Sequence, residues 1–342
     1  MFMKSMAWKQ QNRFALKGLL SLLFLLCLFT LIAPVSAGQI LSDELDIESL
    51  DAYIEGQMAK HGLQGVALAV TSGTEIVYLQ GYGTAGDGRP MTAHTPMYIG
   101  SQSKSFTGLA MAQLVEEGKI RLVDPVQNYI PWFRIADEEA SKKITLAHLL
   151  YHTSGLSESG FSAVIPDDAS VEEAVRALAS ARLTAPVGAK FQYFNYGYVV
   201  LTLVIEETSG QPYEEYIREH IFEPLNMTDT YTDPVLAGKN GLSQGYSRLF
   251  GFVVPQRQPH RSFEIGEGFI ISTAENLAHY TIAMDNAGVY QGNQLLSRPG
   301  MDLLFTPVQG YAMGWFVENG HIFHGGANET FKTYVDVYPL ID

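Results

Sequence analysis

The stretch Tyr98–Gly108 reads YIGSQSKSFTG and places a serine three residues before a lysine, where a helix is predicted to begin. Residues at i and i+3 lie on one face of a helix, so the amine of Lys104 can reach the hydroxyl of Ser101. A serine is a weak nucleophile until a neighbour takes its proton, and burial or a nearby positive charge can lower the pKa of a lysine enough for that work. The alternative is a serine that caps the helix beside a solvated lysine. This is the only S-x-x-K in the chain. The rest of the sequence has to distinguish a catalytic serine–lysine pair from a helix cap.

Two further polar motifs stand next to apolar runs. Tyr193-Phe194-Asn195 is the only Y-x-N and precedes the apolar helix predicted over Tyr196–Thr208. A tyrosine phenolate can act as a base when a lysine ammonium stabilises it, and an asparagine amide can hold a lysine and a substrate carbonyl. His324-Gly325-Gly326 ends an apolar strand, where glycines let a substrate backbone approach closely. Taken alone, the first motif also fits a buried aromatic and the second a turn with a structural histidine.

The order S-x-x-K, Y-x-N, H-x-G, with gaps of about 90 and 130 residues, resembles the penicillin-recognising serine hydrolases. These include class C β-lactamases, DD-peptidases, D-aminopeptidases and family VIII esterases. The resemblance covers most of the chain from about residue 45 and extends to segments such as ITLAHLLYHTSGL and STAENLAHYTIAM. It implies a β-lactamase/transpeptidase-like fold and catalysis through an acyl-enzyme.

The resemblance also implies the catalytic roles. Ser101 would be the nucleophile and Lys104 its proton partner. Tyr193 would act as the general base and then as the acid toward the leaving group. The N–H groups of Ser101 and Ala327 would form the oxyanion hole, and Asn195 would orient both the substrate and Lys104.

Substrate binding at the H-x-G motif departs from the family pattern. His324 would replace the lysine of the K-T-G triad in β-lactamases, and Gly326 would let the substrate backbone approach. Gly325 lacks the hydroxyl that helps to hold a substrate carboxylate in many members. This argues against an efficient β-lactamase and leaves a peptidase or an esterase open.

Strand patterns open the mature chain, helical patterns fill its middle, and strands return at its end. Gly65–Gly83 predicts a hairpin around Ser72-Gly73, and Met313–Gly326 predicts another that turns at Asn319-Gly320. This order predicts an α+β fold, with one antiparallel sheet built from both chain ends, flanked by helices, and an inserted mainly helical part. The predicted helices are Ser42–His61, Ser101–Glu117, Ser170–Leu183, Tyr196–Thr208, Pro212–Phe222 and Ser272–Met284, and a last strand is predicted over Phe331–Pro339.

The resemblance implies one more strand and a C-terminal helix, whereas the sequence ends at Asp342. In the family that strand lies between the N-terminal hairpin and the H-x-G strands. We therefore expect two half-sheets with open edges and no central strand. The sequence leaves open whether it is a fragment or whether another segment fills this place.

The first 37 residues read as a signal peptide ahead of one domain, 38–342. A basic, acid-free start leads into the uncharged run Gly18–Ala33, and Val35-Ser36-Ala37 fits a cleavage site. The alternative is an uncleaved membrane anchor. Either way we expect the domain to be exported, to the medium or the cell envelope. Cys27 is the only cysteine and lies in this segment, so disulfides and thiolate chemistry are excluded from the domain.

Charge excludes other classes of protein. Four of the 22 basic residues lie in the first 37, so 18 remain against 36 acidic residues, a net charge of −18. Such a surface repels nucleic acid and anionic lipid, which leaves the N-terminal segment, if uncleaved, as the expected membrane contact. No metal-binding spacing such as H-E-x-x-H and no phosphate-binding glycine loop occurs, so we expect neither metal nor cofactor.

Two look-alike motifs compete with this interpretation. Residues 241–245 match the G-x-S-x-G elbow, which requires a strand before it and a helix after it. Lys239-Asn240-Gly241 matches K-x-G, but we expect both to lie in loop-like chain. The sequence therefore predicts a serine hydrolase acting on peptides, amides or esters, with cell-wall peptides among the candidate substrates. The alternative is a non-catalytic penicillin-binding or cell-wall-sensing protein that keeps the pocket.

Overall fold

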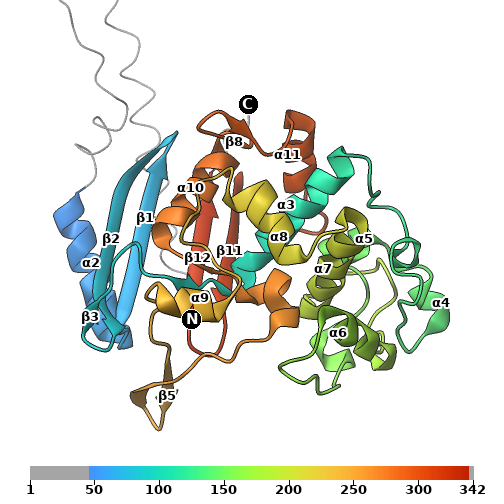
Figure 1. The fold of residues 1–342 in the computed structure, drawn as a ribbon, viewed down its shortest axis with the longest axis horizontal. Helices are drawn as coiled ribbons and strands as arrows, with labels where there is room; N and C mark the ends of the chain where they lie inside the picture. Colours follow the sequence, from blue (N-terminus) through green and yellow to red (C-terminus); the bar gives the residue numbers. More distant parts are fainter. Residues whose placement is uncertain (1–45, 339–342) are drawn as a thin grey trace, which may run out of the picture.

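Helix α3 (Ser103–Glu116) is the central element of the computed structural model, which describes residues 46–338 (Figure 1). Its residues from Ser103 to Leu114 are all buried, because apart from Lys104 and Gln113 they are apolar or small and other elements surround the helix. The predicted signal peptide lies outside the described residues. None of the helices in residues 46–338 is both long and apolar enough to cross a membrane. The other α-helices are α2 (Ile47–His61), α4 (Glu138–Ser141), α5 (Leu146–Leu150), α6 (Val171–Ala177), α7 (Asn195–Ser209), α8 (Tyr213–Ile217), α9 (Pro234–Lys239), α10 (Ala274–Asp285) and α11 (Arg298–Phe305).

The strands confirm the α+β class, because those of the larger sheets come from the two ends of the described chain and the helices come mainly from its middle. They form two three-stranded antiparallel sheets, β1-β2-β3 and β10-β11-β12, which share no strand pair within residues 46–338. Helix α10 lies between these sheets (Figure 1). The half-sheets without a shared central strand that we expected from the resemblance are thus present as two separate sheets in the described residues. The strands are β1 (Gly65–Ser72), β2 (Glu75–Gly86), β3 (Arg89–Pro90), β4 (Met97–Tyr98), β5 (Tyr246–Leu249), β6 (Phe252–Pro255), β7 (Ile271–Ser272), β8 (Val289–Tyr290), β9 (Asn293–Gln294), β10 (Phe316–Glu318), β11 (His321–Ala327) and β12 (Lys332–Val337).

Both predicted hairpins form where their turn residues place them. Strands β1 and β2 pair from Gly65 opposite Gly83 to the turn after Ser72. Strands β10 and β11 turn through Asn319 and Gly320, whose φ angles of 52° and 80° suit the tight turn that such residues favour.

Several predicted elements differ in length or kind. Helix α6 ends at Ala177 and continues only as a short 3₁₀ turn, so the prediction to Leu183 was too long. Pro212 precedes α8 as its N-cap instead of lying in the first turn. The segment before Lys239 forms helix α9, capped by the side chain of Asp233, where we expected a loop.

Candidate active site

The serine of the S-x-x-K motif lies in a 3₁₀ turn, η1 (Gly100–Gln102), directly before α3. This turn is in backbone contact with the end of β11. A Cβ atom on Gly100 would lie 2.5 Å from the nitrogen of Ala327, and one on Gly326 would lie 1.9 Å from the carbonyl oxygen of Ile99. Only glycine fits at either position. The contact therefore brings the H-x-G strand and the N–H of Ala327 beside the turn that carries Ser101.

Lys104 is completely buried one turn into the helix and contacts four acceptors. Its Nζ lies 3.2 Å from Ser101 Oγ and 2.8 Å from Asn195 Oδ1. Glu267 supplies the other two acceptors, because its backbone oxygen and its Oε2 each lie 2.7 Å from Nζ. Glu267 belongs to a π-helical turn, η7 (Ile265–Phe269), which packs against α3. Four acceptors around one nitrogen fit an ammonium that donates all its protons.

The charge state of Lys104 follows from its surroundings. Burial by itself would lower the pKa of Lys104, but the negative charge of Glu267, followed by Tyr193, outweighs burial and raises this pKa above its ordinary value. A lowered pKa of Lys104, which the sequence allowed, is therefore wrong, because the sequence does not reveal the contact with Glu267. Lys104 is therefore a cation that positions Ser101 and Asn195, and the amine has no free lone pair to accept the serine proton.

Tyr193 lies on the other side of this ammonium. Its ring centroid is 5.0 Å from Lys104 Nζ, a cation–π distance. Its hydroxyl oxygen is buried and makes no hydrogen bond within the described part of the chain. A buried hydroxyl without a partner is available to hydrogen-bond with a group that enters the site.

His152 holds the segment that carries Tyr193 and Asn195. Its backbone oxygen accepts from the N–H of Gln192 at 2.7 Å, its Nδ1 accepts from the N–H of Phe194 at 3.2 Å, and its ring centroid lies 4.2 Å from that of Tyr193. Burial, and then the positive charge of Lys104, holds the pKa of His152 well below its ordinary value, so the ring is neutral and Nδ1 stays an acceptor.

His324 lies next to the site, but its two ring nitrogens are hydrogen-bonded to groups other than Ser101 and Lys104. It is 2% exposed, its Nδ1 lies 2.7 Å from the oxygen of Gly325, and its Nε2 lies 3.1 Å from the hydroxyl of Tyr311. Burial, followed by the charge of Lys104, lowers the pKa of His324 to about 4. A neutral imidazole with both nitrogens occupied does not offer the positive charge of the lysine that it was expected to replace.

Acidic groups gather on the side of the site formed by η7. Burial and the charge of Glu267 raise the pKa of Glu264 to about 7, although Arg261 donates to it at 3.2 Å. The carboxylate of Glu158 accepts from the N–H of Asn195 at 2.9 Å. Most of the fixed charge around Lys104 is thus negative.

The structure brings the predicted residues together in two groups. Ser101, Lys104 and Asn195 are joined by hydrogen bonds, with Tyr193 packed against them, whereas Gly326 and Ala327 approach through the backbone. Glu267 and His152 were missed. A carboxylate between two glycines in the apolar run IGEGFI was the available signal for Glu267, because a charge in an apolar segment needs a partner.

The G-x-S-x-G look-alike has the wrong surroundings. Helix α9 precedes it and strand β5 follows it, the reverse of the order that the elbow requires. The hydroxyl of Ser243 lies 3.4 Å from the backbone oxygen of Ala85 and has no histidine or lysine partner in residues 46–338.

A serine turn, a buried lysine and a facing tyrosine on an α+β scaffold match the arrangement expected of the penicillin-recognising serine proteins. The family model described as Beta-lactamase matches residues 50–342, and the chain belongs to this family. Membership supports a serine hydrolase or penicillin-binding role.

Curated relatives are similar over most of the chain. The putative penicillin-binding protein PbpX of Bacillus subtilis (strain 168) is 30% identical over 286 residues, which cover 82% of this chain and 68% of PbpX. Protein flp of Staphylococcus aureus (strain MW2) is 26% identical over 304 residues, which cover 85% of this chain and 60% of flp. The matched part of the chain thus spans less than two thirds of the flp proteins.

Solved structures confirm the fold. The octameric penicillin-binding protein homologue from Pyrococcus abyssi aligns with a TM-score of 0.75 and 28% identity, over 86% of this chain and 71% of that one. FmtA from Staphylococcus aureus aligns with a TM-score of 0.71 and 23% identity, over 86% of this chain and 84% of FmtA.

Proposed function

We propose that the chain is an exported serine hydrolase that acts through an acyl-enzyme on ester, amide or peptide substrates. One observation carries this proposal. The partly exposed Ser101 is hydrogen-bonded to a fully buried Lys104, which Asn195 and Glu267 hold in place. A solvated lysine beside a capping serine, the alternative at the level of sequence, does not account for a buried ammonium with four acceptors.

In the proposed reaction Ser101 Oγ bonds to the substrate carbonyl carbon as its proton passes to Tyr193, which acts as the general base in its phenolate form. The N–H groups of Ser101 and Ala327 stabilise the oxyanion. As the bond to the leaving group breaks, Tyr193 returns the proton to that group. Water then attacks the acyl-enzyme by the same steps and releases Ser101.

The surroundings of the site support a substrate without a carboxylate at the H-x-G end. His324 is neutral, Gly325 carries no hydroxyl, and the carboxylate of Glu158 lies against the N–H of Asn195. Each of these features disfavours an anionic group. An ester, an amide or the interior of a cell-wall peptide fits better than a β-lactam.

A second candidate is a penicillin-binding or cell-wall-sensing protein that is acylated but does not turn over. The hydroxyl of Tyr193 makes no hydrogen bond to Ser101, whose proton it would accept, and this favours slow proton transfer. PbpX is itself named a putative penicillin-binding protein.

Intact-mass measurement separates these possibilities. The full chain is incubated with a fluorophosphonate and, separately, with a labelled penicillin, and the adduct is mapped to a peptide. A fluorophosphonate adduct on Ser101 that Ser101→Ala abolishes and Ser243→Ala keeps supports the hydrolase. A stable penicillin adduct without turnover of esters favours the second candidate, and label on Ser243 overturns both.

Export is part of this proposal and has its own test. Val35-Ser36-Ala37 fits signal cleavage, so mature protein should begin at Gly38. N-terminal sequencing of material recovered from the medium and from the envelope tests this. A chain that retains residues 1–37 would instead be held at the membrane by that segment.

A further inference from the structure

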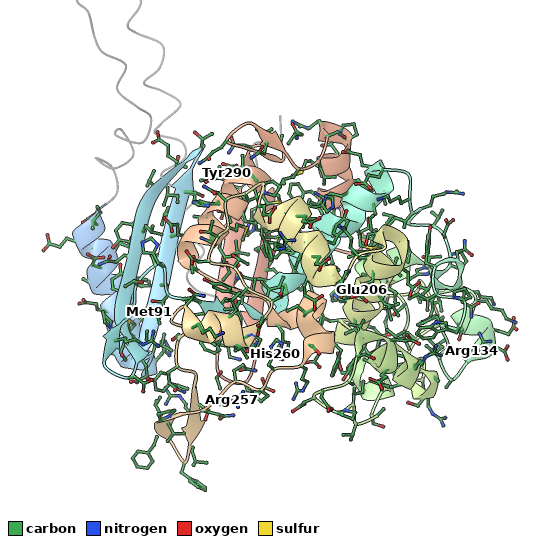
Figure 2. All side chains as sticks on the ribbon, in the orientation of Figure 1. Met91, Arg134, Glu206, Arg257, His260 and Tyr290 are labelled. Atoms are coloured by element: carbon green, nitrogen blue, oxygen red, sulfur yellow. The ribbon has the colours of Figure 1, made fainter. Side chains whose placement is uncertain are left out.

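One hairpin projects from the body of the molecule. Strands β5 and β6 pair only with each other within the described residues, from Tyr246 opposite Pro255 to Leu249 opposite Phe252. Figure 1 shows this hairpin extending beyond the lower edge of the fold, and Figure 2 shows side chains that reach outward from its end.

The tip of the hairpin is apolar and exposed. Leu249 is 55% exposed, Phe250 93% and Phe252 74%. Phe250 and Gly251 form the turn with φ angles of 50° and 87°, a conformation that asparagine or aspartate normally occupies ahead of glycine. A phenylalanine there is strained and contributes little to the chain's own core. An exposed apolar cluster that the fold does not use marks a contact with something else.

The charge around this tip differs from that of the rest of the chain. Residues 234–263 contain four basic residues and no acidic one, although the whole chain has 36 acidic residues against 22 basic ones. Lys239, Arg248 and Arg257 form no ion pair with any described residue, and Arg248 donates to the backbone oxygen of His61. Figure 2 labels Arg257 between the hairpin and the body.

We propose that the β5–β6 hairpin is a membrane-contact element whose tip enters the interface of an anionic bilayer. Leu249, Phe250 and Phe252 would lie among the acyl chains near the headgroups, and Arg248 and Arg257 would face lipid phosphates. The chain's net negative charge opposes such binding at a distance. Charges farther apart than a Debye length of about 8 Å are screened, so a projecting basic hairpin acts locally.

A bilayer fits this tip better than a protein partner does. Aromatic side chains bury about 150–250 Å² each, so two of them with one leucine fall below the roughly 800 Å² per partner of a stable protein interface. A lipid interface can accept a narrow apolar tip flanked by Arg248 and Arg257, whereas a protein partner would need a complementary groove. The sequence analysis expected membrane contact through the N-terminal segment only, so the hairpin adds a second contact.

Such a contact would orient the candidate active site. At the base of the hairpin the N–H of Gln256 donates to the oxygen of Gly245 at 2.9 Å. Gln258 Oε1 accepts from the hydroxyl of Thr330 at 2.7 Å, and Thr330 lies three residues after Ala327. Docking through the tip would therefore hold the H-x-G end of the site close to the lipid surface.

Fluorescence from a single site tests this on the full chain. In a Cys27→Ser background, Phe250→Cys carries a polarity-sensitive probe, and Val123→Cys, at a 65% exposed position beyond the end of α3, is the matched control. The proteins are mixed with phosphatidylglycerol-containing vesicles whose lipids bear a nitroxide quencher. We expect a blue shift and quenching at position 250 but not at 123, and about fivefold weaker binding for each of Arg248→Gln and Arg257→Gln.

Three results would overturn the proposal. The probe at position 250 could stay as water-exposed as the probe at 123, or it could be quenched equally after Leu249→Ser and Phe252→Ser. It could also become shielded without vesicles as the protein concentration rises, which would assign the tip to a second copy of the chain. Because none of these measurements depends on acylation, they stay separate from the test of the proposed function.

Discussion

Lys104 Nζ lies 2.7 Å from Glu267 Oε2 and 2.7 Å from the backbone oxygen of the same residue, so one residue of the π-turn holds the ammonium through both a charge and a dipole. The pair is almost completely removed from water, with side-chain exposures of 0% and 9%. The negative charge of Glu267 therefore raises the pKa of the lysine that donates to Ser101.

Glu267→Gln should shift the alkaline limb of Ser101 acylation to lower pH. The negative charge of Glu267 raises the pKa of Lys104 against burial, so its removal lowers this pKa, and the ammonium is lost earlier as pH rises. A shift of about 1 to 3 pH units is expected, the usual effect of an adjacent opposite charge. The rate of fluorophosphonate labelling between pH 6 and 11 measures it.

Glu264→Gln is the matched control, because Glu264 is bonded to Arg261 and not to Lys104. Its alkaline limb should stay in place. Faster labelling of Glu267→Gln at neutral pH, with a rate that climbs steadily with pH, would mean instead that neutral lysine is the base.

Tyr193→Phe should fold normally and label about 10²-fold more slowly, the usual scale for loss of a general base. The change removes only a hydroxyl that makes no hydrogen bond within the described residues. Stopped-flow acylation together with the melting temperature separates chemistry from folding. Wild-type acylation in a stable variant would remove Tyr193 from the mechanism.

His152→Asn should retain most acylation, whereas His152→Gln should lose about tenfold or more. The amide oxygen of asparagine lies where Nδ1 lies in histidine, so it can accept from Phe194, and asparagine tolerates the φ of 54° at this position. Glutamine places its amide one atom farther out. Labelling rates are compared at equal thermal stability, and equal rates for both variants would show that the Nδ1 contact does not position Tyr193.

His324 should make the fold less stable in mild acid. Its folded pKa of about 4 lies below the ordinary 6.5, so the unfolded state binds the proton first as pH falls. Its stabilising contribution is complete above pH 6.5 and is lost as pH falls toward 4, by about 3 kcal/mol in total. Urea unfolding at several pH values measures the slope, and His324→Gln should reduce it by about one proton. An unchanged slope would assign the acid sensitivity to His152, which is also buried and neutral.

Gly326→Ala should disrupt the site, whereas Gly325→Ala should be tolerated. A methyl group at 326 would lie 1.9 Å from the oxygen of Ile99, but at 325 it meets nothing closer than the ring of Tyr334 at 3.8 Å. The neighbouring variant thus controls for loss of glycine flexibility. We expect slower Ser101 labelling and a lower melting temperature for Gly326→Ala but not for Gly325→Ala. Equal labelling rates and melting temperatures of the two variants would mean that η1 can shift to accommodate the methyl group without loss of stability.

The parts of the site that could be predicted are local in sequence. Ser101 and Lys104 meet because helical spacing brings i and i+3 together. Glu267 could not be paired with Lys104 from the sequence, because 163 positions separate them and a π-turn creates the contact. The orientation of His324 had a signal that was not used, because it alternates with Ile322, and both face the core.

In the fold, too, the elements that local sequence patterns specify could be predicted, whereas pairing between distant segments could not. Turn residues such as Asn319-Gly320 located the hairpins correctly. The separation of the strands into two sheets could be expected only through the family resemblance, because it depends on pairing between distant segments that no local pattern specifies. Helix α9 had its signals in Asp233 and Pro234, an N-cap followed by proline, but its six residues are too few to show periodicity.

The backbone contact between Ile99 and Gly326 joins segments 227 positions apart and determines when the site can exist during biosynthesis. The turn with Ser101 is synthesised well before the strand that completes its surroundings. Contacts between such distant segments form slowly, because a long loop must close first. A nascent chain would therefore carry the serine without these surroundings, and covalent labelling of Ser101 would count only molecules in which the two segments have met.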